Sequence, residues 1–491
     1  MNIFLFNRTG DTSTWRVALR LELITALVVL LFGPSLFEFV VLMLPVFVAS
    51  ELWIRDEGFD RFHLVFIPAM LLFPTVLRDI EFASSGLRPE HMLFLWAFGA
   101  LISGIALGRK VVIPKTFGVL LLAWVLTAVA TSTLQLINDW SFRNMVAAVI
   151  SMQGMTRPLL ILAIFYSIGS NKFFLRSVFS TLVLVGGLVS VFMLMQFLEV
   201  PLVTDITVEY FDRNNVRLTG IDGGRGDVVG TFDGQHNKAG LFSVFWITAT
   251  TMFGMALWLR GRMEWSVVTA ILVLVGYVGL FGTFSRTGFV AAVVAFTVLM
   301  GINFRYNPKR TLIGVSVIII AVLIAALAAE LYGGYVSYRI GGELLDSSYA
   351  LNDPRVTISY PELMSLWQKS PIYGNGYNLG TAADIGYLSE LASRGVIGLS
   401  ILLLLWIYII WNGWKGTRSN DVFISGASAS VIASTLAFSV AMVAIHPFLQ
   451  ARVIDVYWVL VTLTVASVNT RVFNIGLPTG IFSRRSSRLV H

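Results

Sequence analysis

The chain has 491 residues, of which 56% are hydrophobic and 13% charged, against roughly 25% charged in an average soluble domain. No water-soluble core could bury so much apolar surface. The mean hydropathy of +0.79 therefore predicts that lipid surrounds most of the chain and that residues 1–491 form one polytopic membrane domain. The absence of cysteine excludes disulfides, thiolate nucleophiles and cysteine metal sites. The net charge of +7 is attributed to loops at a membrane surface and not to nucleic acid.

Runs of about 20 apolar residues, each long enough to cross the hydrocarbon layer, predict an all-α membrane protein with about 12–14 transmembrane helices. The first two runs are separated only by Pro34 and its neighbours, and they could instead form a broken or re-entrant pair. In chain order, the predicted spans are 17–33, 36–54, 62–77, 92–107, 117–132, 145–168, 178–200, 239–259, 267–282, 287–302, 312–329, 396–414, 422–445 and 453–468.

Basic residues in the short connections predict the orientation of the spans. With a cytoplasmic N-terminus, the even-numbered loops are cytoplasmic, and they hold most of the Lys and Arg of the short loops, as the positive-inside rule requires. These residues are Arg109, Lys110, Lys115, Lys172, Arg176, Arg260, Arg262, Arg305, Lys309, Arg310, Lys415 and Arg418. The tail adds Arg471, Arg484, Arg485 and Arg488. Both termini are therefore predicted to be cytoplasmic.

Two outer connections are long, at 201–238 and 330–395. Long polar loops in a compact membrane protein are seldom idle connectors. We therefore expect any chemistry to lie in these two loops, which should also contain short helices. Segment 356–369 is expected to form a helix on the membrane surface, with Val356, Leu363 and Leu366 on its apolar side.

The first long loop carries Arg217 and Arg225 and ends in Gly230-Thr-Phe-Asp233-Gly-Gln-His236-Asn237. Its glycines allow tight turns close to a ligand. Asn237, or Asp233 before it, could cap the next span, and the N-terminus of that helix would then favour an anion. The alternative is a capped, solvated loop without a ligand.

A short hinge between two spans reads Gly282-Thr-Phe-Ser285-Arg286-Thr-Gly288. An arginine at the outer end of an apolar helix can simply reach toward the interface. If Arg286 instead faces the bundle interior, it is a site candidate, because its planar fork suits a phosphate or pyrophosphate. Arg157, which precedes Pro158 inside a predicted span, could likewise reach into a site or mark a kink.

The second long loop contains Arg355, the glycines Gly374 and Gly376, and the stretch Asp384-Ile-Gly-Tyr387-Leu. Asp384 stands among small and apolar neighbours just before a predicted helix. A carboxylate in that position could be partly desolvated and act as a general base, or it could be a helix cap or a surface charge.

Other chemistry is weakly marked. His236 and His446 are both outside in the predicted topology and could assist proton transfer. Histidine and carboxylate residues show no metal-ligand spacing, so no metal is expected. The sequence has neither a P-loop nor a dinucleotide fingerprint, so no cofactor is expected.

The order of these motifs resembles the O-antigen polymerase and ligase superfamily of bacterial envelope enzymes. The match runs from Arg217 to Gly398 in motifs and over the whole chain in topology. Its parts are the loop end at Gly230-Thr-Phe and Asn237, the hinge Ser285-Arg286-Thr-Gly288, and the second-loop motifs Arg355, Ser370-Pro-Ile-Tyr-Gly374-x-Gly376, Tyr387-Leu and Gly395-x-x-Gly398.

This resemblance implies a metal-independent glycosyltransferase of the GT-C type in the bacterial inner membrane, with its active site on the periplasmic face. The implied donor and acceptor are oligosaccharides carried on undecaprenyl pyrophosphate, and a chain-length regulator and a flippase are the implied partners. Ligases of the superfamily transfer the glycan to lipid A-core. Polymerases join repeat units. The ligase pattern has a histidine followed by Asn near Tyr387, where this chain has Asp384, so a polysaccharide polymerase is the expected branch.

The resemblance also implies roles for individual residues. Arg286, with Arg217 or Arg225 and with Arg355, would stabilise the pyrophosphate leaving group. Asp384 would activate the acceptor hydroxyl. The substrate would be contacted by Arg225, Asn237, His236, Tyr387, Gly374, Gly376 and Arg157. A single displacement with inversion is expected, since no separate nucleophile is evident. A ligase is the nearest alternative, and a transporter of lipid-linked oligosaccharides or anions is the alternative from another class.

Overall fold

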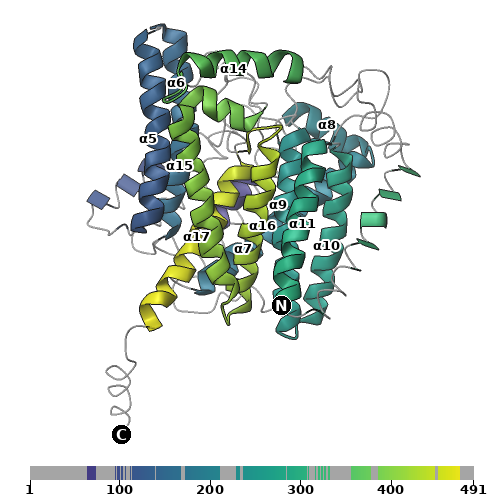
Figure 1. Ribbon diagram of the computed structural model, residues 1–491. Coiled ribbons are helices and arrows are strands. Elements are labelled where there is room, and N and C mark those ends of the chain that lie inside the picture. The colour runs from purple at the N-terminus through teal and green to yellow at the C-terminus, as the bar shows by residue number, and fades with distance from the viewer. Residues whose placement is uncertain are drawn as a thin grey trace.

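The computed structural model describes residues 63–72, 113–138, 140–166, 172–210, 228–232, 236–283, 285–306, 355–376, 385–447 and 452–475. It also describes isolated positions between 94 and 111 and between 308 and 331. Within this part of the chain the regular elements are helices, which run side by side as a bundle (Figure 1). The predicted spans 17–33 and 36–54 lie outside the described residues.

Among the described residues, seven helices are long and apolar enough to cross a membrane, which is the architecture of an all-α, multi-pass membrane protein. They are α5 (Lys115–Asn138), α7 (Lys172–Phe197), α9 (His236–Leu259), α10 (Met263–Gly282), α11 (Arg286–Tyr306), α15 (Gly386–Thr417) and α16 (Val422–Ala441). Shorter apolar stretches lie in α6 (Phe142–Tyr166) and α17 (Val453–Ile475). Residues of α3 (His63–Leu72) match the start of another predicted span.

Helix α9 is the centre of the bundle and packs against α7, α10, α11, α16 and α17. Its composition is apolar all round, which suits a helix surrounded by other helices. Small residues on its neighbours admit its large side chains. Gly186 of α7 and Gly276 of α10 both face Trp246 of α9, and the Trp246 indole donates a hydrogen bond to the Val183 carbonyl at 3.1 Å.

The bundle has two ends of different character. At one end, called here the loop end, α9 begins, α10 ends and α11 and α17 begin, and the short helices α8 (Pro201–Tyr210) and α14 (Tyr360–Lys369) lie nearby (Figure 1). The opposite end, called the basic end, holds the turn between α9 and α10 and the turn between α15 and α16, with Arg260, Arg262, Lys415 and Arg418. This placement agrees with the predicted sidedness of these loops.

Helix α14 follows a π-helical turn at Arg355–Ser359 and lies across the start of α15 (Figure 1). A helix was predicted here with Leu363 and Leu366 on its apolar side. That side packs on the protein, where Leu363 is buried against Leu388 and Ala392 of α15. Leu388 and Ala392 lie on one face of the first turns of α15, and this helical face provides the apolar surface on which α14 packs.

Helix α15 begins within the predicted second loop and changes direction at Gly395, whose φ is +64°. Glycine adopts this conformation without the steric cost of a Cβ atom. A Cβ at Gly395 would also collide with the carbonyl of Ile372 in the turn after α14. The break separates a short helix at 386–394 from the long apolar run that follows, and it places the charged side chains of the short helix inside the bundle.

Candidate functional site

The end of the first long loop and the hinge between α10 and α11 meet at the loop end. The hydroxyl of Ser285 donates a hydrogen bond to Asn237 Oδ1 at 2.9 Å. The same hydroxyl accepts a hydrogen bond from the Gly288 backbone N–H at 3.0 Å, which is the geometry of an N-cap. Arg286 is the first residue of α11 and is half-buried.

The expectation that Asn237 caps α9 is corrected here. Asn237 lies inside the first turn of α9, which begins at His236, and its side-chain oxygen binds Ser285. The capped helix is therefore α11. Its N-terminus, with Arg286 in the first position, combines the positive end of a helix dipole with a guanidinium group, and both favour an anion.

Close contact between α9 and α11 makes this meeting possible. A Cβ added to Gly288 would lie 3.2 Å from the Gly240 Cα, and one added to Gly240 would lie 2.7 Å from the Ser285 Cβ. Both distances are shorter than ordinary carbon contacts. Glycine at 240 and 288 therefore sets the separation of the two helices that carry Asn237 and Ser285.

The segment 228–232 of the first loop is fixed to the bundle by hydrogen bonds. The Val228 N–H donates to the Gly282 carbonyl at the end of α10 at 2.9 Å. Gln196 of α7 binds Gly230 twice: its Oε1 accepts from the Gly230 N–H at 2.9 Å, and its Nε2 donates to the Gly230 carbonyl at 3.2 Å. Gly230 has a φ of +59°, so the turn requires a residue without a Cβ.

A buried ion pair lies on the other side of this segment. The Arg157 Nη1 atom of α6 is 3.1 Å from the Asp455 Oδ2 atom of α17. The same oxygen accepts from the Arg452 backbone N–H at 3.0 Å. The Arg452 Nη1 atom donates to the Thr231 carbonyl at 3.4 Å. Asp455 thus connects α6, α17 and the first loop.

A second buried group of charges belongs to the start of α15. Glu390 lies 3.3 Å from the Arg394 Nε atom and 3.4 Å from the His446 Nε2 atom, and all three side chains are fully buried. The Arg394 guanidinium carbon lies 4.3 Å from the ring centroid of Trp124 on α5. Charged side chains inside an apolar bundle are costly and mark functional sites by default, with a structural ion-pair network as the alternative.

One connector supplies residues to both groups. The connector between α16 and α17 is described at residues 442–447 and at Arg452. It carries His446 and Arg452, and its backbone forms hydrogen bonds with the start of α15. The Ile385 N–H donates to the Ala444 carbonyl at 3.1 Å. The Tyr387 N–H donates to the Met442 carbonyl at 3.1 Å, and its hydroxyl donates to the Ser439 carbonyl at 2.8 Å. Tyr387, predicted to contact substrate, therefore joins α15 to α16.

The two predicted glycines of the second loop lie in a turn that packs closely against helices. Gly374 and Gly376 have φ values of +77° and +83°. A Cβ on Gly374 would collide with the backbone of Ser393 and Arg394, and one on Gly376 would lie 2.8 Å from the Thr131 carbonyl of α5. These glycines hold the turn after α14 against α15 and α5.

The remaining predicted residues are placed only in part. Arg217, Arg225 and Asp384 lie outside the described residues, and Arg355 is described only in its backbone. His236 is half-buried at the first position of α9. Among the described residues, no three His, Asp or Glu side chains gather in a way that could hold a metal ion.

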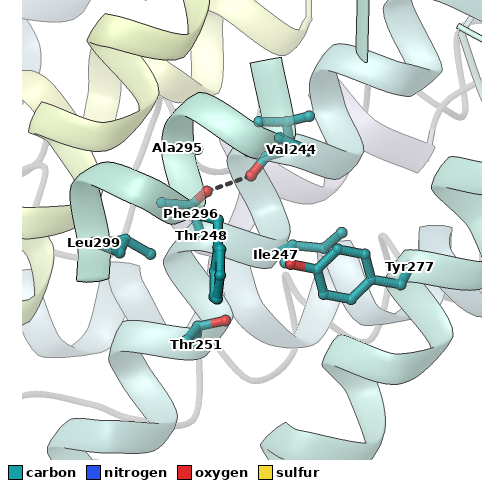
Figure 2. A pocket seen from close by; sticks show the side chains of 9 residues that line it. Val244, Ile247, Thr248, Thr251, Tyr277, Ala295, Phe296 and Leu299 are labelled. Carbon is teal, nitrogen blue, oxygen red and sulfur yellow. Dashed lines mark hydrogen bonds between the residues drawn. The ribbon is translucent and has the colours of Figure 1, made fainter. Parts of the chain in front are cut away.

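A small apolar groove, with a cavity volume of about 20 Å³, lies between α9, α10 and α11. Figure 2 shows Ile247 of α9 between the rings of Phe296 and Tyr277. Val244, at the near end of the groove, follows Asn237 by two turns of α9, or about 11 Å along the axis. The lining residues are Val244, Ile247, Thr248, Thr251, Tyr277, Ala292, Ala295, Phe296 and Leu299.

Sequence reasoning missed Glu390, Arg394, Arg452 and Asp455, and it treated His446 only as a minor candidate. The spacing of Glu390 and Arg394, four residues apart, is the pattern of an ion pair on one helix face. It was overlooked because residues up to 395 were assigned to the second long loop and the membrane span was expected to begin only at residue 396. Arg452 and Asp455 stand at the start of a predicted span, where charges are ordinarily attributed to the interface.

The chain was compared with protein-family models, characterised proteins and solved structures, and none of them matches it.

Proposed function

We propose that the protein is a membrane glycosyltransferase that polymerises polysaccharide repeat units carried on a polyprenyl pyrophosphate. One observation carries the proposal: the end of the first loop and the N-terminus of α11 converge through the bond between Asn237 and Ser285, next to Arg286. This position lies at the loop end of a bundle built mainly from apolar helices. It offers an anion-binding helix terminus beside membrane-spanning helices, as a lipid-linked pyrophosphate requires.

In the proposed reaction, the acceptor sugar hydroxyl attacks the anomeric carbon of the donor glycan. A new C–O bond forms, the bond to the pyrophosphate oxygen breaks, and the hydroxyl proton passes to a carboxylate, for which Asp384 is our candidate. Charge accumulates on the departing pyrophosphate. Arg286 and the first turn of α11 would stabilise this charge, with Arg217 and Arg355 as further candidates.

The apolar groove supports this assignment because a lipid-linked substrate must place its chain beside its head group. The groove lies along α9 and α11, the same two helices that carry Asn237 and Arg286, and it begins about 11 Å further into the bundle. In this proposal the isoprenoid chain lies along the outside of the groove while its pyrophosphate stays at the loop end. Apolar lining with a few hydroxyl groups is typical of sites for such ligands.

Two alternative functions differ from polymerisation in what happens to the glycan. A ligase would use the same donor but would transfer the glycan to lipid A-core. A transporter of lipid-linked oligosaccharide is favoured by one specific observation, the two buried groups at Arg157–Asp455 and Glu390–Arg394–His446. Ionisable groups inside a membrane bundle are characteristic of substrate and proton pathways.

The decisive experiment supplies purified protein in proteoliposomes with a lipid-linked repeat unit and no added metal. A polymerase produces a ladder of longer glycans on lipid. Product formed only with lipid A-core would indicate a ligase. Movement of intact substrate across the vesicle membrane, with no new glycosidic bond, would indicate a transporter.

Variants then test the site. Arg286→Ala and Asp384→Ala should each nearly abolish the ladder. Arg305→Ala is the matched control, because Arg305 lies in the last turn of the same helix at the basic end, and it should retain full activity. If Arg286→Ala and Asp384→Ala both retain the activity of the control, the assigned site is wrong even where polymerisation is observed.

A further inference from the structure

The basic end of the bundle contains a compact group of arginines that the proposed function does not use. Arg176 of α7 and Arg260, after α9, both approach the ring of Phe423 at the start of α16. Their guanidinium carbons lie 4.8 Å and 4.5 Å from the same ring centroid. Two like charges share one aromatic ring, which stabilises each of them by a cation–π interaction while they repel one another.

The local charges do not balance. Arg262 also lies close enough to repel Arg176. Asp421 is the carboxylate that attracts Arg176, and its Oδ2 atom is 3.7 Å from the Arg260 Nη2 atom. Among the described residues, these interactions join three cations to one carboxylate, and Glu264 in the first turn of α10 is exposed. The Asp421 Oδ1 atom already accepts hydrogen bonds from the Phe423 and Ile424 N–H groups as the N-cap of α16, so its charge is divided among several partners.

The group lies at the level where lipid head groups are expected. The apolar spans begin at Phe174 in α7, end at Leu259 in α9 and begin again at Met263 and Val422. The three arginines and Asp421 all stand within three residues of these boundaries. Leu259 and Met263, which flank Arg260 and Arg262, are 49% and 58% exposed. Apolar surface next to the cations suits an acyl chain beside a phosphate.

From these observations we infer that Arg176, Arg260, Arg262 and the ring of Phe423 form a binding site for the phosphate of an anionic phospholipid. The excess positive charge attracts the phosphate, and the planar guanidinium groups match its geometry. The exposed Leu259 and Met263 then contact the acyl chains. This inference is independent of the proposed glycosyl transfer, because it concerns the opposite end of the bundle.

The test measures lipid binding to purified full-length protein in detergent, by native mass spectrometry with dioleoyl phosphatidylglycerol or dioleoyl phosphatidylcholine. The wild type should retain the anionic lipid in preference to the zwitterionic one. Each basic residue near a membrane surface contributes about 1 kcal/mol, or about fivefold in affinity. Arg260→Gln should therefore weaken phosphatidylglycerol binding about fivefold, and Arg176→Gln combined with Arg260→Gln about 25-fold.

A variant that is expected to strengthen lipid binding distinguishes a lipid site from a closed ion-pair network. Asp421→Asn removes the competing negative charge, while asparagine remains a good N-cap, so the start of α16 should stay folded. A lipid site predicts that Asp421→Asn binds phosphatidylglycerol about fivefold more tightly than the wild type. Unchanged or weaker binding would show that these arginines do not hold the lipid phosphate, and would overturn the inference.

Lys415→Gln is the matched control for surface charge. Lys415 is an exposed cation at the same end of the bundle and lies over a different ring, that of Trp411, at 5.2 Å. It should change phosphatidylglycerol binding less than twofold. An effect as large as that of Arg260→Gln would indicate a diffuse surface potential and no site. Displacement of the lipid by millimolar inorganic phosphate would assign the arginines to a soluble anion and would equally overturn the proposal.

Discussion

The Ser285 hydroxyl donates to Asn237 Oδ1 at 2.9 Å, across a gap of 48 residues in sequence. This single bond joins the last residues of the first long loop to the hinge that carries Arg286. Hydrogen bonds between membrane helices average about 0.6 kcal/mol and reach about 1.7 kcal/mol, so its contribution to folding is small. Its importance lies in the position that it gives to two groups predicted to bind the same pyrophosphate.

Ser285→Ala should therefore reduce transfer activity far more than stability. The change removes both the bond to Asn237 and the cap of α11, at a cost of about 1–2 kcal/mol. Misplacing the N-terminus of α11 should lower the rate of polymer formation about tenfold or more. Initial rates with a lipid-linked repeat unit check this, with thermal unfolding in detergent measured in parallel. Ser285→Thr, which keeps a hydroxyl, should recover part of the rate. Equal rates for the alanine and wild-type proteins would contradict the assignment.

Gly288→Ala should separate α9 from α11. The added methyl group would meet the Gly240 Cα at 3.2 Å, and overpacking of this kind costs about 1–3 kcal/mol. Gly301→Ala is the control on the same helix, because a Cβ there meets nothing within 4 Å. It should be neutral or slightly stabilising, since alanine is the better helix former. The unfolding temperatures of the two variants check the prediction, which fails if they shift equally.

Breaking the buried pair between Arg157 and Asp455 should cost more than removing it. Asp455→Ala leaves a buried guanidinium group without its carboxylate and also removes the acceptor of the Arg452 N–H, so a loss of about 3–5 kcal/mol is expected. Arg157→Met combined with Asp455→Leu should lose less than Arg157→Met or Asp455→Leu alone, because only the single changes leave a buried charge without its partner. Unfolding in a denaturant series measures the four corners of this double-mutant cycle. Additive losses would show that the two side chains do not depend on each other.

Glu390→Gln should destabilise the start of α15. The carboxylate lies between Arg394 and His446, and a neutral amide would remove the negative charge that faces the buried Arg394, at a cost of about 3–5 kcal/mol. Proteolysis of the 386–394 segment, compared between the variant and the wild type, detects the loosening. Glu362→Gln, an exposed position in α14, is the control and should be as resistant as the wild type. Unchanged cleavage of Glu390→Gln would show that the pair is dispensable.

Filling the groove should affect long-chain substrates selectively. Ala292→Phe places a ring into the groove between α9, α10 and α11, along which the polyprenyl chain of the donor is proposed to lie. Transfer from an undecaprenyl-linked donor should fall about tenfold or more, whereas a donor with a short isoprenoid chain should be affected less. Val293→Phe is the control, because Val293 is the next residue on the same helix and its side chain is 66% exposed. An equal loss with both donors would argue against a chain along the groove.

The sequence located most of the described helices because lipid imposes a simple rule. Spans of about 20 apolar residues must be helical to satisfy their backbone groups. The helices α5, α9, α10, α11 and α15 each contain a predicted run, and α7 and α16 each overlap most of one. The start of α15 was missed, because residues 386–394 carry Glu390 and Arg394 and therefore resemble a polar loop. Only tertiary contacts with the 442–447 connector and Trp124 show these charges to be buried.

By itself, then, the sequence determined the all-α membrane architecture, the division into a basic end and a loop end, and the motifs worth testing, since hydropathy and charge act locally along the chain. The tertiary structure decided which distant residues meet. It placed Asn237 on Ser285, Arg157 on Asp455 and Glu390 on His446. Such pairings follow from the close packing of helices and the directions of side chains, which no local pattern specifies.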